Sequence, residues 1–210
     1  HTLPQEGIIE LMVRLAQSGR SLVRLKGGDP YIFGRGGEEA EALAAAGIAC
    51  DTVPGISAAQ GAAAATGIPL THRDHAAMLV FATGHLQGEE GERTVALDWA
   101  ALARPHQTVV IYMGVGTLPI ICAQLIAHGL PASTPAAMIE RATLPGQRSI
   151  VGTLQTLPQL SVAYGVNPPA LVMIGDTVAL HARIGSSAEV LTGFPAVVDA
   201  ASPQALACTA

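Results

Sequence analysis

Apolar residues recur along this chain with two different periods, and each period predicts a kind of element. Spacings of three and four residues, typical of one face of a helix, join Ile8, Leu11, Met12 and Leu15. Short apolar runs between glycines and prolines predict strands, because such runs are too short for most helices. Besides that first helix, helices are expected at 38–46, 57–66, 99–102, 118–128 and 157–164. Strands are expected at 21–26, 48–53, 78–83, 108–113, 135–140, 148–153 and 170–174.

Strands alternate with helices, which indicates an α/β protein. The pattern restarts near residue 76, so we expect an N-terminal α/β domain over 1–75 and a C-terminal α/β domain over 76–195. A loose tail is expected over 196–210. The first part offers only two strands, and two strands do not make a stable layer. We therefore expect further strands upstream of His1.

Composition removes several classes of protein. The chain has 210 residues, of which 50% are hydrophobic, and a formal net charge of −5, which argues against nucleic acid as a partner. Gly, Pro or charges interrupt its apolar stretches before the roughly 20 residues that a membrane span needs. No signal peptide is visible. The cysteines show no metal spacing, which favours a reduced, cytoplasmic compartment, with Cys50 and Cys122 as small buried apolar residues.

The densest chemistry lies in segment 24–39, R-L-K-G-G-D-P-Y-I-F-G-R-G-G-E-E. Glycines let the backbone approach a ligand closely, and Asp29 can accept hydrogen bonds from one. In open α/β sheets, ligands bind at loops that leave the carboxyl ends of strands. The alternative is that these glycines only form turns. Two familiar nucleotide loops are excluded: G-x-x-x-x-G-K-[ST] is absent, and the third glycine of G-x-G-x-x-G is replaced by Glu39.

Six blocks in this order resemble the signatures of the uroporphyrinogen-III C-methyltransferases, over roughly residues 1–180. The first is V-R-L-K-G-G-D-P-Y-I-F-G-R-G-G-E-E. The others are V-P-G-I-S-A from Val53, G-I-P-L-T-H-R from Gly67, T-G-H from Thr83, Y-M-G from Tyr112 and P-P-A from Pro168.

The resemblance implies a two-domain tetrapyrrole methylase fold. Each domain is a mixed sheet flanked by helices, with the active site in the trough between them. It also implies S-adenosyl-L-methionine as cofactor, S-adenosyl-L-homocysteine as its product, and a homodimer. The cofactor site implied by the family comprises Gly27, Gly28, Asp29, Ile32, Ser57, Ala58, Met113 and Ala142. The family often has Gly at the last of these positions, so a methyl group there departs from its pattern.

Arg35, Glu38 and Arg73 are the candidates for substrate binding and catalysis. Uroporphyrinogen III, the substrate that the resemblance implies, carries eight carboxylates, and Arg pairs with carboxylates through a rigid two-pronged fork. A ring carbon that accepts a methyl group must then lose a proton. The alternative for Glu38 and Glu39 is that they favour the positive end of a helix, and both functions can hold together.

The implied reaction is methylation at carbons two and seven, giving precorrin-2 for sirohaem or cobalamin. Alternatives are a methylase of a later corrin intermediate, or a relic that binds ligand without turnover. Fusion to a dehydrogenase–chelatase module is also open. The family's G-P-G-D loop, and the Asp and Lys proposed to handle protons, have no counterpart here, so we expect the 210 residues alone to be inactive. No metal site is expected, because His72, His75 and His85 match no zinc spacing.

Overall fold

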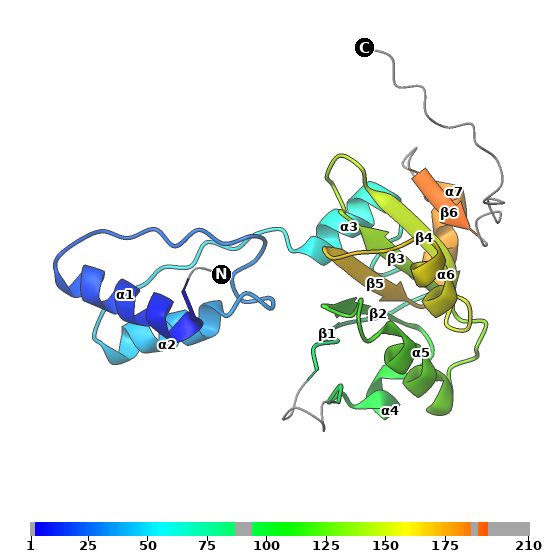
Figure 1. Cartoon of the computed structure of the whole chain (residues 1–210), viewed down its shortest axis with the longest axis horizontal. Coiled ribbons are helices and arrows are strands. Elements are labelled where there is room, and N and C mark those ends of the chain that lie inside the picture. Colours follow the sequence, from blue (N-terminus) through cyan, green and yellow to red (C-terminus); the bar gives the residue numbers. More distant parts are fainter. Residues whose placement is uncertain (1–2, 87–93, 186–188, 193–210) are drawn as a thin grey trace, which may run out of the picture.

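The computed structural model describes residues 3–86, 94–185 and 189–192. Its main body is a six-stranded sheet with strand order β1-β2-β5-β3-β4-β6 (Figure 1). Pairs β1–β2 and β4–β6 are parallel and the other pairs are antiparallel, so the sheet is mixed. The strands are β1 Met78–Thr83, β2 Gln107–Tyr112, β3 Pro135–Glu140, β4 Arg148–Thr153, β5 Ala170–Ile174 and β6 Glu189–Thr192.

The helices are α1 Gln5–Gln17, α2 Gly36–Ala45, α3 Ala58–Thr66, α4 Trp99–Leu102, α5 Leu118–Ala127, α6 Leu157–Ala163 and α7 His181–Ile184. The ends of α2 to α6 agree with the expected ranges to within two residues, and α1 lies where the first helix was expected. The pattern did not predict α7, the 3-10 helix at Asp176–Leu180 or β6. The α/β class is therefore confirmed, whereas the expected tail over 196–210 lies outside the described residues.

Alternate residues of each central strand face opposite layers of the core. Val109 and Ile111 of β2 pack into the cluster covered by α5 and α6, whereas Val110 faces α3. The same alternation holds along β3 and β5, so both faces of the sheet are buried. Strands buried on both faces are continuously apolar, which is the pattern that made them predictable.

Helix α3 packs against the sheet through small side chains. Ala59 and Ala62 are fully buried against Val110 and Met173, and alanine lets the helix approach the strands closely. Gly67 ends the helix in the left-handed conformation with φ 68°, where a side chain would be strained. The division between two domains near residue 75 stays a prediction.

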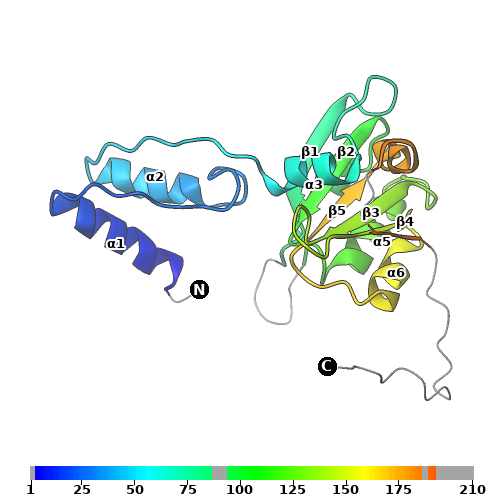
Figure 2. The same ribbon diagram turned by 90° about the horizontal axis from the view of Figure 1, so that it is seen from above.

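Helices α1 and α2 pack together and stand apart from the sheet in both views (Figures 1 and 2). The expected strands at 21–26 and 48–53 are wrong as strands: both segments run extended but pair with no strand in the described part of the chain. Without a pairing partner they keep their apolar residues in solvent, and Val23 is 86% and Val53 80% exposed. A strand requires a partner, which an apolar run alone does not supply.

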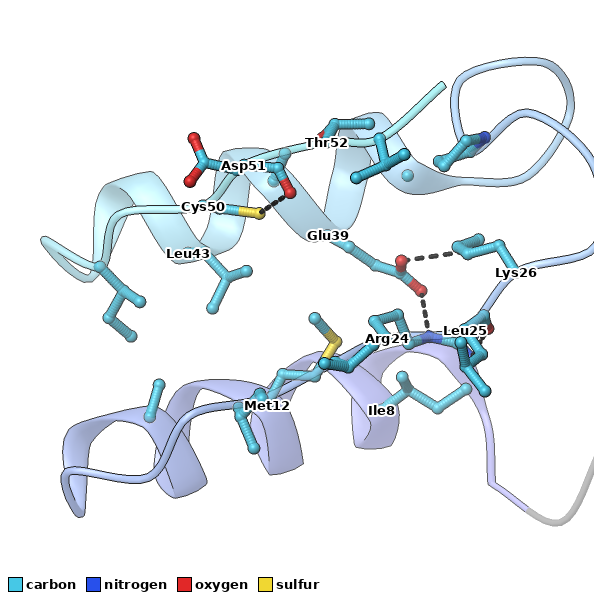
Figure 3. Close-up of a pocket in the computed structure, with 18 of the residues that line it drawn as sticks. Ile8, Met12, Arg24, Leu25, Lys26, Glu39, Leu43, Cys50, Asp51 and Thr52 are labelled. Carbon is cyan, nitrogen blue, oxygen red and sulfur yellow. Dashed lines mark hydrogen bonds and ion pairs between the residues drawn. The ribbon is translucent and has the colours of Figure 1, made fainter. Parts of the chain in front are cut away.

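The two extended segments and the two helices enclose a groove of about 1060 Å³ (Figure 3). Ile8, Met12 and Leu43 give it an apolar floor. Cys50 lies beside the groove and is exposed, so its prediction as a buried residue is wrong. Cys122 is buried as predicted, and burial raises the pKa of its thiol to about 12. Among the described residues, none of the helices combines the length and the apolar character that crossing a bilayer requires.

Candidate functional site

The candidate site lies where the parallel strands β1 and β2 end together, at Thr83 and Tyr112. The loops that follow these strands are in close contact, since a Cβ on Gly84 would lie 2.7 Å from the Cα of Gly114. Two glycines therefore let the loops cross without side chains between them. This is the carboxyl edge of a parallel strand pair, where open α/β sheets bind ligands.

The glycine loop, residues 27–37, lies against the segment that leads into α3. Gly28 has φ +80°, and a Cβ there would lie 3.5 Å from the Cα of Ser57. Gly55 comes even closer, because its Cβ would lie 2.6 Å from the carbonyl oxygen of Gly28. The Asp29 carboxylate joins the segments, accepting hydrogen bonds from the backbone N–H of Tyr31 at 2.9 Å and of Gly55 at 3.1 Å. The structure thus brings Gly28, Asp29 and Ser57 together.

The glycines of the loop divide into two kinds. A Cβ on Gly34 or Gly36 would lie 2.7 or 2.5 Å from the carbonyl oxygen of Pro30, so these two glycines are needed for the loop to fold over itself. Around Gly27, by contrast, no atom lies within 4 Å of the added Cβ. The turn interpretation therefore explains Gly34 and Gly36, whereas the space beside Gly27 is open to a ligand.

The start of α3 is held by the end of β2. Ala59 donates its backbone N–H to the Tyr112 hydroxyl at 3.0 Å, and that hydroxyl donates to Ser57 Oγ at 3.2 Å. Ser57 is buried and Ala58, the first residue of the helix, is exposed. Ala58 is therefore an exposed residue at the N-terminus of α3, and its backbone nitrogen lies near Gly28.

A tilted contact between two aromatic rings connects the glycine loop to the sheet. The Phe33 ring lies 4.7 Å from the Tyr112 ring between centroids. The next residue along the chain, Met113, has φ 54° and is 54% exposed. Met113 therefore directly follows the residue whose ring contacts the glycine loop. Ile32, in the same loop, is half-buried and donates its N–H to the Asp29 carbonyl at 3.2 Å.

Ala142 lies in the turn between β3 and β4, packed against the α3 side of the core. Arg141 and Thr143 on either side adopt positive φ, but Ala142 does not. Alanine is therefore compatible with the backbone at this position. The Thr143 methyl would lie 3.4 Å from a Cβ on Gly61, which brings the turn against α3.

Arg35 and Glu38 form a two-pronged ion pair. Arg35 Nε and Nη2 donate to the two carboxylate oxygens of Glu38 at 2.9 and 2.6 Å, and both side chains are about half exposed. The hydrogen bond with Glu38 raises the pKa of the Arg35 guanidinium, and the same bond lowers the pKa of Glu38. Glu38 is thus an ionised carboxylate at neutral pH, beside a cation and open to solvent.

Arg73 is exposed in the loop after α3, between His72 and His75, whose rings lie 4.8 Å apart. In the described part of the chain, its side chain makes no hydrogen bond or ion pair that would hold it in place. Such an arginine is available to an anion. The described residues contain no cluster of three or more His, Cys, Asp or Glu arranged to hold a metal.

Two anchoring residues were missed by sequence reasoning. Glu39, 4% exposed, accepts hydrogen bonds from Arg24 at 3.2 Å and Lys26 at 2.9 Å (Figure 3), and a third from Gln5 at 3.1 Å. Glu39 of α2 therefore connects this helix to α1, through Gln5, and to the residues just before the glycine loop, through Arg24 and Lys26. The other is Tyr112, which lies inside a recognised block. The sequence signal for both was weak, because an acid at a helix start and an aromatic at a strand end are each routine.

A family model described as tetrapyrrole (corrin/porphyrin) methylases matches residues 1–158. A siroheme synthase of Nitrosospira multiformis is 55% identical over 184 residues, which is 88% of this chain but 38% of that protein. The siroheme synthase of Nitrosomonas europaea is 54% identical with the same coverage. The chain thus spans well under half the length of these curated relatives.

Among solved structures, the uroporphyrin-III-C-methyltransferase of Thermus thermophilus matches with a TM-score of 0.72 and 39% identity. The match covers 87% of this chain and 76% of that one. This similarity confirms the tetrapyrrole methylase fold that was expected from the sequence.

Proposed function

Because the chain belongs to the tetrapyrrole (corrin/porphyrin) methylases, we propose that the polypeptide containing it C-methylates uroporphyrinogen III. The methyl donor is S-adenosyl-L-methionine, the methylated carbons are two and seven, and the product is precorrin-2. The observation that carries this proposal is the convergence of three segments at one sheet edge: the glycine loop at Gly28, the start of α3 at Ser57 and the end of β2 at Met113.

The residues at this convergence fit a nucleoside thioether. Gly27, Ala58 and Met113 are exposed there, while Ser57 beside them is buried, so a ligand would cover a preformed surface. No cationic side chain belongs to this set, which suits a positively charged sulfonium. A related uroporphyrin-III C-methyltransferase of Thermus thermophilus, 38% identical over 84% of this chain and 75% of that one with a TM-score of 0.67, was solved with S-adenosyl homocysteine bound.

The chain's own residues have separate roles in this proposal. When bound, S-adenosyl-L-methionine supplies an electrophilic methyl group, and the protein contributes mainly orientation. Arg73 and Arg35 pair with substrate carboxylates. Glu38, ionised beside Arg35, is the candidate acceptor of the proton that the methylated ring carbon releases, and its ion pair with Arg35, which lowers its pKa, makes it a weaker base than a free carboxylate. Asp29 acts on the backbone: its two hydrogen bonds fix the loop against Gly55.

The test is calorimetry with S-adenosyl-L-homocysteine, together with transfer of labelled methyl groups to uroporphyrinogen III, on the polypeptide as the cell makes it. We expect binding, doubly methylated product, and weakened binding in Asp29→Ala. Wild-type affinity in that variant removes Asp29 from the site. Methylation of a later corrin but not of uroporphyrinogen III would indicate a methylase of a later corrin intermediate. Binding without turnover would indicate a relic that binds ligand and does not catalyse.

We further propose that the protein is a homodimer, with the exposed apolar residues as candidates for its interface. Val162 is 81% exposed, and Ile56, beside the start of α3, is 73% exposed. Light scattering over a hundredfold range of concentration tests this, and a constant monomer mass refutes it. The cytoplasmic location stays a prediction.

A further inference from the structure

We infer that Tyr112 is the positioning residue of the cofactor site: it fixes the start of α3 and the glycine loop relative to the end of β2. It is the last residue of β2 and contacts the other two segments, through its hydroxyl on Ser57 and Ala59 and its ring on Phe33. The inference rests on the proposed function, because it names the group that arranges the proposed site.

The hydrogen bonds at the hydroxyl have only one possible direction. The backbone N–H of Ala59 can only donate, so the Tyr112 oxygen accepts there. Gln60 Oε1 can only accept, so the Ser57 hydroxyl proton goes to it, and Ser57 Oγ accepts the Tyr112 proton. The Ser57 hydroxyl then donates to Gln60 Oε1 at 2.6 Å, and that oxygen also accepts the Ser57 backbone N–H at 2.7 Å. The result is a directed chain from β2 into the first turn of α3.

Tyr112 thereby adds a hydrogen bond from another element to the capping box that Ser57 and Gln60 form at the start of α3. The residue before a helix usually accepts a hydrogen bond from the second or third N–H of that helix. Here the capping box serves the third N–H of the helix, at Gln60, and the Tyr112 oxygen accepts the second, that of Ala59. Ala59 is fully buried and Ser57 is 3% exposed, so solvent does not readily replace the tyrosine.

The ring of Tyr112 performs the second task. Phe33 has φ 51°, a conformation that a bulky residue keeps only when its surroundings hold it. The centroid of its ring lies 4.7 Å from that of the Tyr112 ring. The Phe81 ring of β1 also contacts the Tyr112 ring, edge to face, at 5.8 Å between centroids. The ring contact therefore holds the glycine loop, while the hydroxyl holds α3.

These two functions separate in two variants. Tyr112→Phe keeps the ring and removes the hydroxyl, so the start of α3 loses its fixed place while the loop keeps its stacking partner. We expect S-adenosyl-L-homocysteine to bind about tenfold more weakly, equivalent to about 1.4 kcal/mol. Tyr112→Leu removes both contacts and should weaken binding further. Hydrogen exchange at the Ala59 amide should accelerate in both variants, because its acceptor is gone.

Tyr164→Phe is the matched control, since Tyr164 follows α6 and packs on the opposite face of the sheet. Its affinity should equal that of the wild type. Calorimetry and thermal melting are measured together on the natural polypeptide, and Tyr112→Phe should melt within a few degrees of the control. The loss of affinity at preserved stability distinguishes positioning from a role in folding alone.

The double variant Ser57→Ala/Tyr112→Phe gives a second readout. Because Tyr112 acts through Ser57, the two losses of affinity should not add. Wild-type affinity in Tyr112→Phe, or an affinity loss that only follows a collapse in melting temperature, overturns the inference. Failure of the wild type itself to bind S-adenosyl-L-homocysteine instead refutes the proposed function, and the inference with it.

Discussion

Replacing Gly55 by alanine should force apart two segments of the candidate site. A Cβ at this position would lie 2.6 Å from the carbonyl oxygen of Gly28 and 2.9 Å from its carbonyl carbon, whereas ordinary contact begins at 3.4 Å. Both neighbours are backbone atoms, which cannot rotate out of the way as a side chain can. The loop at Gly28 must therefore move by most of an ångström.

The magnitude follows from the two contacts that the movement disturbs. Overpacking of this kind costs about 1–3 kcal/mol. The hydrogen bond from Gly55 to the Asp29 carboxylate also lengthens, and bonds to charged groups contribute about 1.5–3 kcal/mol. These costs overlap, so we expect a loss of about 3 kcal/mol, from a stability that is typically about 5–15 kcal/mol. The protein stays folded, but S-adenosyl-L-homocysteine should bind at least about tenfold more weakly.

Urea unfolding and calorimetry on the natural polypeptide measure both effects. Gly7→Ala is the matched control, because its added Cβ would meet only side-chain atoms, the nearest at 3.6 Å. Gly7 lies inside α1, where alanine should instead stabilise the helix by about 0.5–1 kcal/mol. Wild-type stability and affinity in Gly55→Ala would mean that the two segments do not approach as described, and the site would lose its geometric basis.

Three further predictions test single side chains. Arg35→Ala and Arg73→Ala should each cut turnover, or raise the apparent Michaelis constant for uroporphyrinogen III, by about a hundredfold while S-adenosyl-L-homocysteine still binds. If S-adenosyl-L-homocysteine no longer binds, the arginine serves the cofactor and not the tetrapyrrole. Burial favours the neutral form of Glu39, but hydrogen bonds from Lys26 and Gln5 outweigh it and its pKa is lowered. Its stabilising effect is therefore complete above about pH 4.5 and is lost as pH falls through its folded pKa, so Glu39→Gln should unfold with less dependence on acid pH, and equal slopes would refute this. Iodoacetamide at pH 8 should label exposed Cys50 long before Cys122, whose burial raises its pKa to about 12, as peptide mass mapping would reveal.

The C-terminal part of the fold was predictable because local and tertiary signals agree there. Strands β2, β3 and β5 are buried on both faces, so each contains a run of consecutive apolar residues in the sequence. Their boundaries are marked by glycine or proline, as at Gly175 after β5. The 3-10 helix and α7 that follow were missed: elements of five and four residues show no full helical repeat, and α4 was the one such short helix that was predicted from the sequence.

The extended segments 21–26 and 48–53 had the same local signal and yet form no strands. An apolar run reports the tendency of a segment to extend, whereas a strand also needs a partner of suitable register. The same limit applies to Cys50, which lies in the second of these segments and is exposed. Burial is a property of the surroundings, so it could not be predicted from residue type where the surroundings were unknown.

The candidate site shows the same difference at the level of single residues. Sequence blocks named Gly28, Ser57 and Met113 because each lies in a recognisable motif, but no motif states which glycine serves the loop and which faces a ligand. Geometry separates them: the chain itself fills the space around Gly34 and Gly36, and leaves it open at Gly27. The residue that connects the motifs, Tyr112, contributes through a hydroxyl hydrogen-bonded to residues more than fifty positions away along the chain. Such a contact has no periodicity, so only the folded structure identifies Tyr112 as the point where the three segments meet.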